Sequence, residues 1–244
     1  MVLRPRRQRL AADEGGHTCW KVEEEERVVP AARVAVIVCD VWDRHWSRGA
    51  SERVDVLAPR VDSVLKAARA RGAHIIHAPS DTLEFYEGSR ARLRAKQAPH
   101  VEPPADLPIP DRPLPIDDSD GGSDTGETPW HRAWSRQHPA VEIDEDRDAV
   151  SDDGWEIYSY LRQVGADQVV LLGVHTNMCV LGRSFGIKRW VRWGVPVMLV
   201  RDLTDTMYNP ARSPYVSHDE GTRLVVEYIE KFWCPSVSSA DLVG

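Results

Sequence analysis

The stretch Gly-Val-His-Thr-Asn-Met-Cys-Val, residues 173–180, directly follows the apolar run Val169–Leu172. An apolar run that ends in a glycine and a polar turn, before a helix-competent segment, places that turn at the carboxyl edge of a sheet. Cys179 stands in this turn. At a helix N-terminus, unpaired backbone N–H groups and the positive end of the helix dipole favour the thiolate. We therefore expect Cys179 to be a nucleophile, with a small buried structural cysteine as the alternative.

Length and charge limit the classes of protein to consider. With 244 residues and 42% apolar content, the chain can form one large α/β domain with a sizeable core. A formal charge of −7 argues against a nucleic-acid partner, because phosphate binding requires a clustered basic face. The one basic cluster, Arg4 to Arg9, is interpreted as a tail or an edge strand. We expect a small molecule to be the substrate.

The cysteine pattern and the hydropathy point to a reducing, aqueous environment. Four cysteines lie far apart without a C-x-x-C pair, which indicates neither a zinc finger nor a disulfide framework. No apolar run follows the N-terminal arginines, and no segment approaches the roughly 18 apolar residues of a membrane helix. The sequence therefore predicts a cytoplasmic protein without a membrane partner.

Apolar runs alternate with helical periodicity along the chain. Strands are predicted over 34–39, 73–78, 141–143, 168–172, 195–200 and, at an edge, 234–237. Helices are predicted over 51–71, 83–96, 155–164, 180–193 and 222–232. This order predicts a three-layer α/β/α sandwich around a doubly wound, mostly parallel, Rossmann-like sheet.

Composition divides the chain into parts. Residues 1–32 are charged and are predicted to form an N-terminal extension, residues 33–237 the α/β domain, and residues 238–244 a C-terminal tail. Within the domain, residues from about 98 to 129 are rich in proline and aspartate and poor in apolar anchors. Such a composition predicts a long surface insertion.

The first predicted strand ends at Asp40. In a doubly wound sheet the first and fourth predicted strands are neighbours where the winding reverses, so Asp40 and Cys179 should meet in the ligand crevice. A carboxylate beside a thiol can take its proton. A helix cap or a loop hydrogen bond is the alternative role for Asp40.

The Asp40 and Cys179 motifs resemble those of the isochorismatase-like cysteine hydrolases, which include nicotinamidases and carbamoyl amidases. The resemblance covers roughly residues 34–232 and includes the later Gly194 and the strand that ends in Arg-Asp at Asp202. It implies an isochorismatase-like fold and a homo-oligomer, for which the proline-rich insertion offers a contact surface.

The resemblance also implies a mechanism. Cys179 would attack the carbonyl of a small amide to form an acyl-enzyme, while Asp40 shuttles protons. The backbone N–H groups of His175 and Cys179 would form the oxyanion hole, with a cis peptide bond between Val174 and His175.

The chain departs from the family pattern at the third catalytic residue, a lysine near the end of the third strand. Residues 141–153 contain no lysine, and Lys96 is the only one between Asp40 and Cys179 outside the first long helix. Arg147 is the nearest cation to the expected place, although a guanidinium does not readily donate a proton. The departure leaves open a variant hydrolase, an isomerase-like activity, an isochorismate-type enol-ether hydrolase, or a catalytically silent binding or scaffold protein.

Further candidates surround the predicted crevice. The substrate pocket is predicted to include Trp42, His45, His77, Asn177 and Tyr208, with Trp46, Trp130 and Trp134 shaping or covering it. Core packing is the alternative for each tryptophan, and a structural turn is the alternative for Tyr208.

Asp43, His45 and His77 have the ligand chemistry of a divalent metal site for zinc, iron or manganese. Hydrogen bonding within loops is the competing interpretation. No cofactor is required by the sequence, because it contains neither a Walker loop nor a G-x-G-x-x-G motif.

Overall fold

The centre of the sheet is strand β5 (Val34–Cys39), in which every residue is buried. It pairs in parallel with β8 (Gln168–Val174) on one side and with β6 (His74–Ala78) on the other. Fully buried apolar strands are typical of a parallel sheet that helices cover on both faces. The predicted adjacency of the first and fourth strands of the domain is confirmed.

The structure, a computed structural model, describes residues 1–128 and 131–244. Its main sheet has the strand order β3-β2-β10-β9-β8-β5-β6-β7, and β1 and β4 form a separate pair. The strands from β10 to β7 are parallel, whereas β2 and β3 add an antiparallel hairpin at one edge. The remaining strands are β1 (Val2–Leu3), β2 (Arg6–Ala12), β3 (Thr18–Glu24), β4 (Arg27–Val28), β7 (Ala149–Val150), β9 (Val197–Asp205) and β10 (Ser236–Val237).

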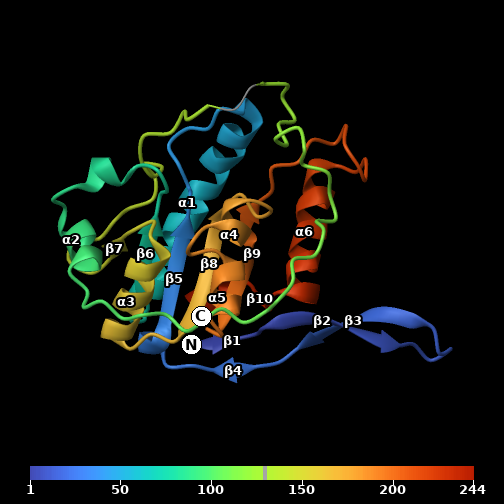
Figure 1. Ribbon diagram of the computed structural model, residues 1–244, viewed down its shortest axis with the longest axis horizontal. Coiled ribbons are helices and arrows are strands. Elements are labelled where there is room, and N and C mark those ends of the chain that lie inside the picture. The colour runs from blue at the N-terminus through green and yellow to red at the C-terminus, as the bar shows by residue number, and fades with distance from the viewer. Residues whose placement is uncertain (129–130) are drawn as a thin grey trace.

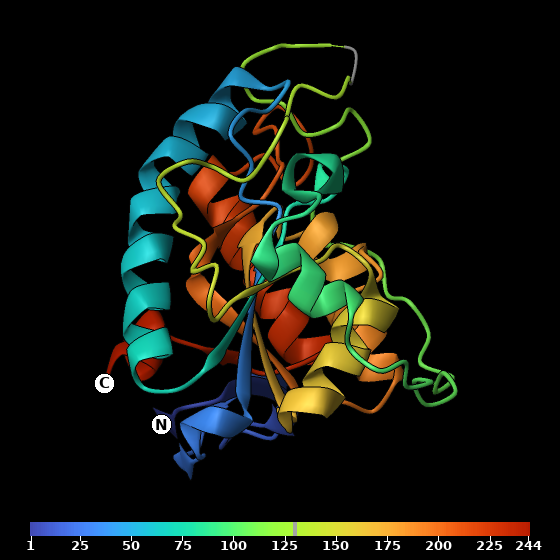
Figure 2. The same ribbon diagram turned by 90° about the vertical axis from the view of Figure 1, so that its left-hand side faces the viewer.

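Helices cover both faces of the sheet, which confirms the three-layer sandwich (Figure 2). The apolar cluster on one face includes side chains of α1 (Arg48–Ala70) and α7 (Ser239–Val243). The cluster on the other face includes side chains of α3 (Gly154–Val164), α5 (Ile187–Arg192) and α6 (His218–Phe232). The shorter helices are α2 (Arg90–Lys96) and α4 (Cys179–Gly182), with 3-10 turns at Ala31–Arg33 and Leu83–Tyr86. None of the helices among the described residues has the length and hydropathy to cross a bilayer.

The N-terminal residues form a hairpin at the edge of the sheet. Strands β2 and β3 extend away from the body of the molecule (Figure 1). Three of the clustered arginines lie in β2, so they belong to a strand as predicted, but β3 and not β2 is the edge strand. Arg6 anchors this strand to α6, because its Nε lies 3.0 Å from a carboxylate oxygen of the fully buried Glu230 side chain.

The predicted strand over 141–143 is wrong. Val141 packs with the α1 side of the core, and the backbone N–H of Glu142 donates to Asp62 of α1 at 2.9 Å. These contacts hold the segment on the helix, away from the sheet, and the strand beside β6 is β7 instead. Between α2 and β7, the described residues form no helix and no strand of the sheet.

Glycines explain why two predicted helices are interrupted. Gly88, with φ +83°, separates the 3-10 turn Leu83–Tyr86 from α2. Gly186 separates α4 from α5, and a Cβ there would lie 2.9 Å from the backbone of Leu181 and Arg183. The chain therefore folds back just after Cys179, so that α4 has four residues.

Gly173 is the penultimate residue of β8, and we expect its replacement by alanine to be strongly destabilising. Its φ is +112°, and an added Cβ would lie 2.0 Å from the carbonyl oxygen of Cys39 on β5. At Gly72, with φ +99°, an added Cβ meets no atom within 4 Å. Urea unfolding should show Gly173→Ala to be at least about 2 kcal/mol more destabilising than Gly72→Ala, since only the former adds a backbone clash to the strained φ. Equal losses would contradict the close approach of the two strands.

Candidate active site

Asp40 lies at the carboxyl end of β5, fully buried. Its φ is +49°, in the left-handed region, and its backbone N–H donates to the carbonyl of Ala78 at the end of β6. One carboxylate oxygen, Oδ1, accepts a hydrogen bond from the backbone N–H of Ser80 at 2.7 Å. The ends of two adjacent strands thus fix the position of this carboxylate.

Cys179 meets Asp40, as the strand adjacency predicted. Cys179 is the first residue of α4, its side chain is partly exposed, and its thiol forms a hydrogen bond with the Asp40 carboxylate. A titratable sulfur and a buried carboxylate therefore share one hydrogen bond at the carboxyl edge of the sheet.

Arg183 supplies the cation of this cluster. Its Nε donates to Asp40 Oδ2 at 3.2 Å, and its Nη2 donates to Asp81 Oδ2 at 3.2 Å. Arg183 directly follows α4, four residues after Cys179, so a single short turn presents the thiol and the guanidinium to the same carboxylate. Arg183 was not predicted as a site residue, although its four-residue spacing from Cys179 is a signal that could have identified it.

Arg147 does not join the cluster. It precedes β7, at the amino end of a strand that runs parallel to β6, and thus at the opposite edge of the sheet from Cys179. Its Nη2 donates to the carbonyl oxygen of Arg69, near the C-terminus of α1, at 2.6 Å. Arg147 is near the expected lysine in sequence only, because residues 141–143 form no strand that would carry it to the site.

The pKa values of the pair are shifted by burial. Burial raises the pKa of Asp40, while Arg183, the Cys179 thiol and Ser80 act to lower it. Burial and the nearby Asp40 carboxylate raise the pKa of the Cys179 thiol well above its ordinary value, against the opposing effect of Arg183. Burial and the Asp40 carboxylate therefore outweigh the groups that favour the thiolate, which are Arg183 and the His175 backbone.

A cavity of about 500 Å³ opens beside Cys179 and Arg183. Much of its wall is aromatic: Trp42 and Trp134 stack with ring centroids 4.1 Å apart and planes within 8°, and Trp46 adds a third indole. Trp42 and Trp46 thus line the cavity, as does Trp134, whereas Trp130 lies outside the described residues. A volume of this size suits a small molecule.

Two neutral histidines complete the aromatic wall. His45 stacks on Trp134 at 5.6 Å, and His175 meets His45 edge-on at 4.9 Å. Burial lowers the pKa of His45 to about 4 and that of His175 to about 3, so both rings are uncharged at neutral pH. The peptide bond between Val174 and His175 is cis, as expected.

His77 was predicted to line the pocket, but the structure places it elsewhere. Its ring is fully buried and bonds to the Gln137 side chain through Nδ1 and to Asp148 through Nε2. Asp148 also accepts a hydrogen bond from Arg69 Nε of α1 at 2.8 Å. His77 therefore ties β6 to α1 and to the segment before β7, because a buried polar ring needs partners at both nitrogens.

Asn177 and Tyr208 are likewise not among the described cavity residues. The side-chain amide of Asn177 makes two hydrogen bonds with the backbone of Met207. Its Nδ2 donates to the Met207 carbonyl, and its Oδ1 accepts from the Met207 N–H at 3.0 Å. The fully buried Tyr208 donates its hydroxyl to the Arg212 carbonyl at 2.8 Å. Both residues stabilise the loop after β9. For Tyr208 this is the alternative role, that of a structural turn.

The three metal-ligand candidates do not form one group. Asp43 accepts hydrogen bonds from the backbone and hydroxyl of Ser135, His45 stacks in the cavity wall, and His77 bonds to Asp148. Among the described residues, no cluster of three His, Cys, Asp or Glu side chains has the arrangement of a metal site. The donor set present does not fit the predicted divalent metal.

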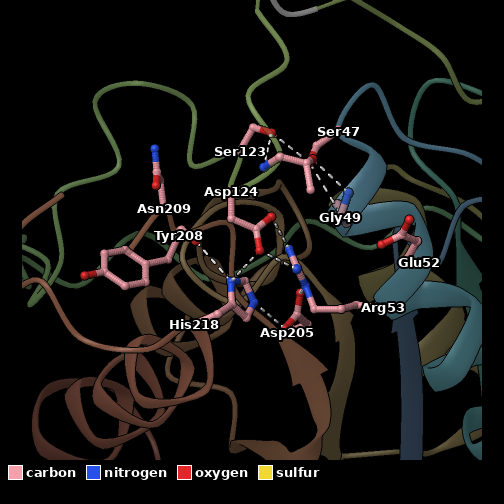
Figure 3. A network of polar contacts seen from close by, with 12 residues as sticks. Ser47, Gly49, Glu52, Arg53, Ser123, Asp124, Asp205, Tyr208, Asn209 and His218 are labelled. Carbon is pink, nitrogen blue, oxygen red and sulfur yellow. Dashed lines mark hydrogen bonds and ion pairs between the residues drawn. The ribbon is translucent and has the colours of Figure 1, made fainter. Parts of the chain in front are cut away.

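Part of the insertion forms one wall of the cavity and is held to the domain by hydrogen bonds and ion pairs. Arg53 of α1 donates to Asp124 at 2.8 Å and to Asp205, at the end of β9, at 3.0 Å (Figure 3). His218, at the start of α6, bonds to Asp205 at 2.9 Å. Figure 3 also shows Ser123 beside Ser47, which precedes α1, with their hydroxyl oxygens 3.0 Å apart. These contacts hold residues 120–128 over the end of the sheet that carries Cys179.

The fold and site define an α/β sandwich with a Cys–Asp–Arg cluster at the carboxyl ends of parallel strands. Its structural neighbours include a cysteine hydrolase from Pseudomonas syringae pv. phaseolicola 1448A, with a TM-score of 0.53, 19% identity, and coverage of 88% of this chain and 92% of that one. An isochorismatase from Pseudomonas putida KT2440 matches with a TM-score of 0.53 and 14% identity over 87% of this chain and 91% of that one.

The chain therefore has an isochorismatase-like α/β fold, as its motifs predicted, and its structural neighbours are consistently isochorismatase-family and cysteine hydrolase proteins. No protein-family model matches the sequence, and no curated protein matches it either.

Proposed function

We propose that this protein is a cysteine hydrolase that cleaves a small amide or related C–N bond through an acyl-enzyme on Cys179. The observation that carries the proposal is the position of the buried Asp40 carboxylate, which contacts the Cys179 thiol and Arg183. Cys179 and Arg183 in turn line a cavity sized for a small molecule. A nucleophile, a proton acceptor and a cation are thereby within reach of one bound carbonyl.

In the first half of the reaction, the Cys179 thiol gives its proton to Asp40 as Sγ attacks the carbonyl carbon. Sγ needs this transfer, because burial beside a carboxylate keeps the resting thiol protonated. The C–N bond of the tetrahedral intermediate then breaks, and Asp40 returns the proton to the leaving nitrogen. Ammonia or an amine departs, and a thioester remains on Cys179.

In the second half, Asp40 takes a proton from a water molecule that attacks the thioester. The C–S bond breaks, the acid leaves, and Sγ recovers the proton from Asp40. The same carboxylate thus acts twice as base and twice as acid.

Backbone N–H groups stabilise the oxygen that becomes negative. In the proposed oxyanion hole, the N–H groups of His175 and Cys179 donate to the oxyanion, and the His175 backbone already acts on the resting thiol by lowering its pKa. Donors fixed by the backbone need no reorganisation as charge develops.

Arg183 takes the electrostatic part of the family lysine in this proposal. Its guanidinium lowers the pKa values of both Asp40 and Cys179, and so favours the carboxylate base and the attacking thiolate. Proton transfer is left to Asp40, because a guanidinium does not readily lose its proton.

The direct test is to trap the acyl-enzyme. We expect mass spectrometry of the acid-quenched wild-type protein, mixed with a panel of small amides, to detect an acyl adduct on the peptide that contains Cys179. Cys19, which is also partly exposed, serves as the internal control and should remain unmodified. Ammonia release without any adduct on Cys179 would contradict the covalent route.

A further inference from the structure

The charged groups in the cavity wall are predominantly negative. Among its described lining residues are three carboxylates, Asp81, Asp120 and Glu127, but a single guanidinium, that of Arg183. The two histidines of the wall add no positive charge at neutral pH, because their pKa values lie at about 4 and about 3. The charged side chains that line the cavity in the described residues are therefore negative in sum.

The positive charge of Arg183 is already balanced. Its guanidinium contacts Asp40 through Nε and Asp81 through Nη2, each at 3.2 Å. A bound carboxylate would have to compete with both partners, and would then approach the remaining acidic groups. Like charges placed together in a cavity are strongly unfavourable, so the site disfavours anionic substrates.

Glu127 differs from the other two carboxylates in having neutral partners. Its Oε2 accepts hydrogen bonds from the hydroxyls of Ser123 at 2.8 Å and Thr125 at 2.5 Å, and the backbone N–H of Arg48 contributes a third. These donors lower the pKa of Glu127 to about 2 without cancelling its charge. Among the described residues, the carboxylate thus remains an ion at neutral pH without a bound cation.

Trp46 lines the same cavity as this carboxylate. Ser47, the next residue, is connected to Glu127 through the Ser123 hydroxyl, with 3.0 Å between the two serine oxygens. The Trp46 ring rests against Gly121, where an added Cβ would lie 3.3 Å from it. An indole face and a carboxylate together form the usual recognition site for an organic cation.

We propose that the preferred substrate is a small amide that carries a cationic group, such as an ammonium, held between Trp46 and Glu127 while its carbonyl lies at Cys179. Asp120, which shares this wall, adds to the attraction, although Arg212 lies 3.7 Å from it and offsets part of its charge. The inference rests on the proposed function only in placing the amide carbonyl at Cys179.

Three amides of matched shape test the charge preference. We would measure the Kd of 4-(aminomethyl)benzamide, 4-(hydroxymethyl)benzamide and 4-carboxybenzamide by calorimetry on the full chain with Cys179→Ala, which prevents turnover. The cation should bind at least about tenfold tighter than the neutral alcohol, and the carboxylate weakest of all. Equal binding of the first two ligands, or tightest binding of the carboxylate, would overturn the inference.

Single substitutions show which carboxylate is responsible for the preference for a cationic ligand. In Glu127→Gln protein, the affinities for the cationic amide and for the neutral alcohol should differ by no more than about threefold. Asp120→Asn should reduce this affinity ratio less. The matched control is Glu14→Gln in the exposed turn of the N-terminal hairpin, which removes the same charge far from the cavity and should leave the ratio unchanged. An unchanged ratio in folded Glu127→Gln protein would refute the role of Glu127.

The two proposals fail in different ways. If wild-type protein forms no adduct with any amide, the proposed hydrolysis fails, whereas the binding ratio in the Cys179→Ala protein is still measurable. If the adduct forms equally well with neutral and cationic amides and the affinities are equal, hydrolysis stands and the charge preference is wrong.

Discussion

Replacing Cys179 by alanine is expected to lower amide hydrolysis by at least roughly 10⁴-fold, since removal of a covalent nucleophile leaves only binding and oxyanion stabilisation. The side chain is small and partly exposed, so the fold should be retained. The measurement is the rate of ammonia release from the best amide of the panel, with circular dichroism and the urea midpoint to confirm that the variant is folded.

The matched control for this prediction is Cys19→Ala, which removes the other partly exposed thiol, in strand β3 of the N-terminal hairpin. Its hydrolysis rate should equal that of the wild type. If Cys179→Ala instead releases ammonia at the full rate, the thiol is dispensable, and direct attack of water on the amide becomes the better explanation.

The parts of the site that depend on strand order could be predicted from the sequence. Val34–Cys39 and the apolar run before Gly173 are continuous enough to be recognised as buried parallel strands. Parallel strands have their carboxyl ends at one edge, so the residues that follow them meet. This geometry is why the meeting of Asp40 and Cys179 was predictable without any knowledge of side-chain packing.

The parts that depend on long-range packing were not predictable. His77 lies near the carboxyl end of β6 and so has the pattern of a site residue, yet its hydrogen bond to the buried Asp148 of a distant segment determines its role. Glu127 belongs to a segment with few apolar anchors, and its place in the cavity wall follows from hydroxyl contacts and from the Arg53–Asp124 ion pair. Such contacts between loops leave no periodic signal in the sequence.

The cation of the Cys179–Asp40 site comes from a different element than the resemblance implies. The resemblance placed a lysine at the end of the third strand, but that part of the chain is held against α1. The Cys179 turn itself supplies Arg183, whose guanidinium contacts two carboxylates through different nitrogens. A lysine at this position would keep the positive charge but lose the planar set of donors, so we expect Arg183→Lys to have an intermediate effect.

Replacing Arg183 by alanine is expected to lower kcat/KM for the amide by about 10²–10³-fold, the usual effect of removing one electrostatic contact from a developing charge. Arg183→Lys should recover part of this loss. Arg189→Ala is the matched control, because Arg189 of α5 is similarly exposed and pairs with Asp106. A loss of activity in the control as large as in Arg183→Ala would indicate a general structural effect.

The pH profile separates an electrostatic role of Arg183 from a merely structural one. Arg183 lowers the pKa of Asp40, whose deprotonated form must accept the thiol proton, so its removal raises that pKa further. Asp81, left without its partner, adds negative charge nearby and shifts the Asp40 pKa in the same direction. The acid limb of kcat/KM against pH should therefore move to higher pH in Arg183→Ala and return toward its original position in Arg183→Lys. A lower rate with an unmoved acid limb would show that Arg183 acts on substrate or fold and does not tune the proton acceptor.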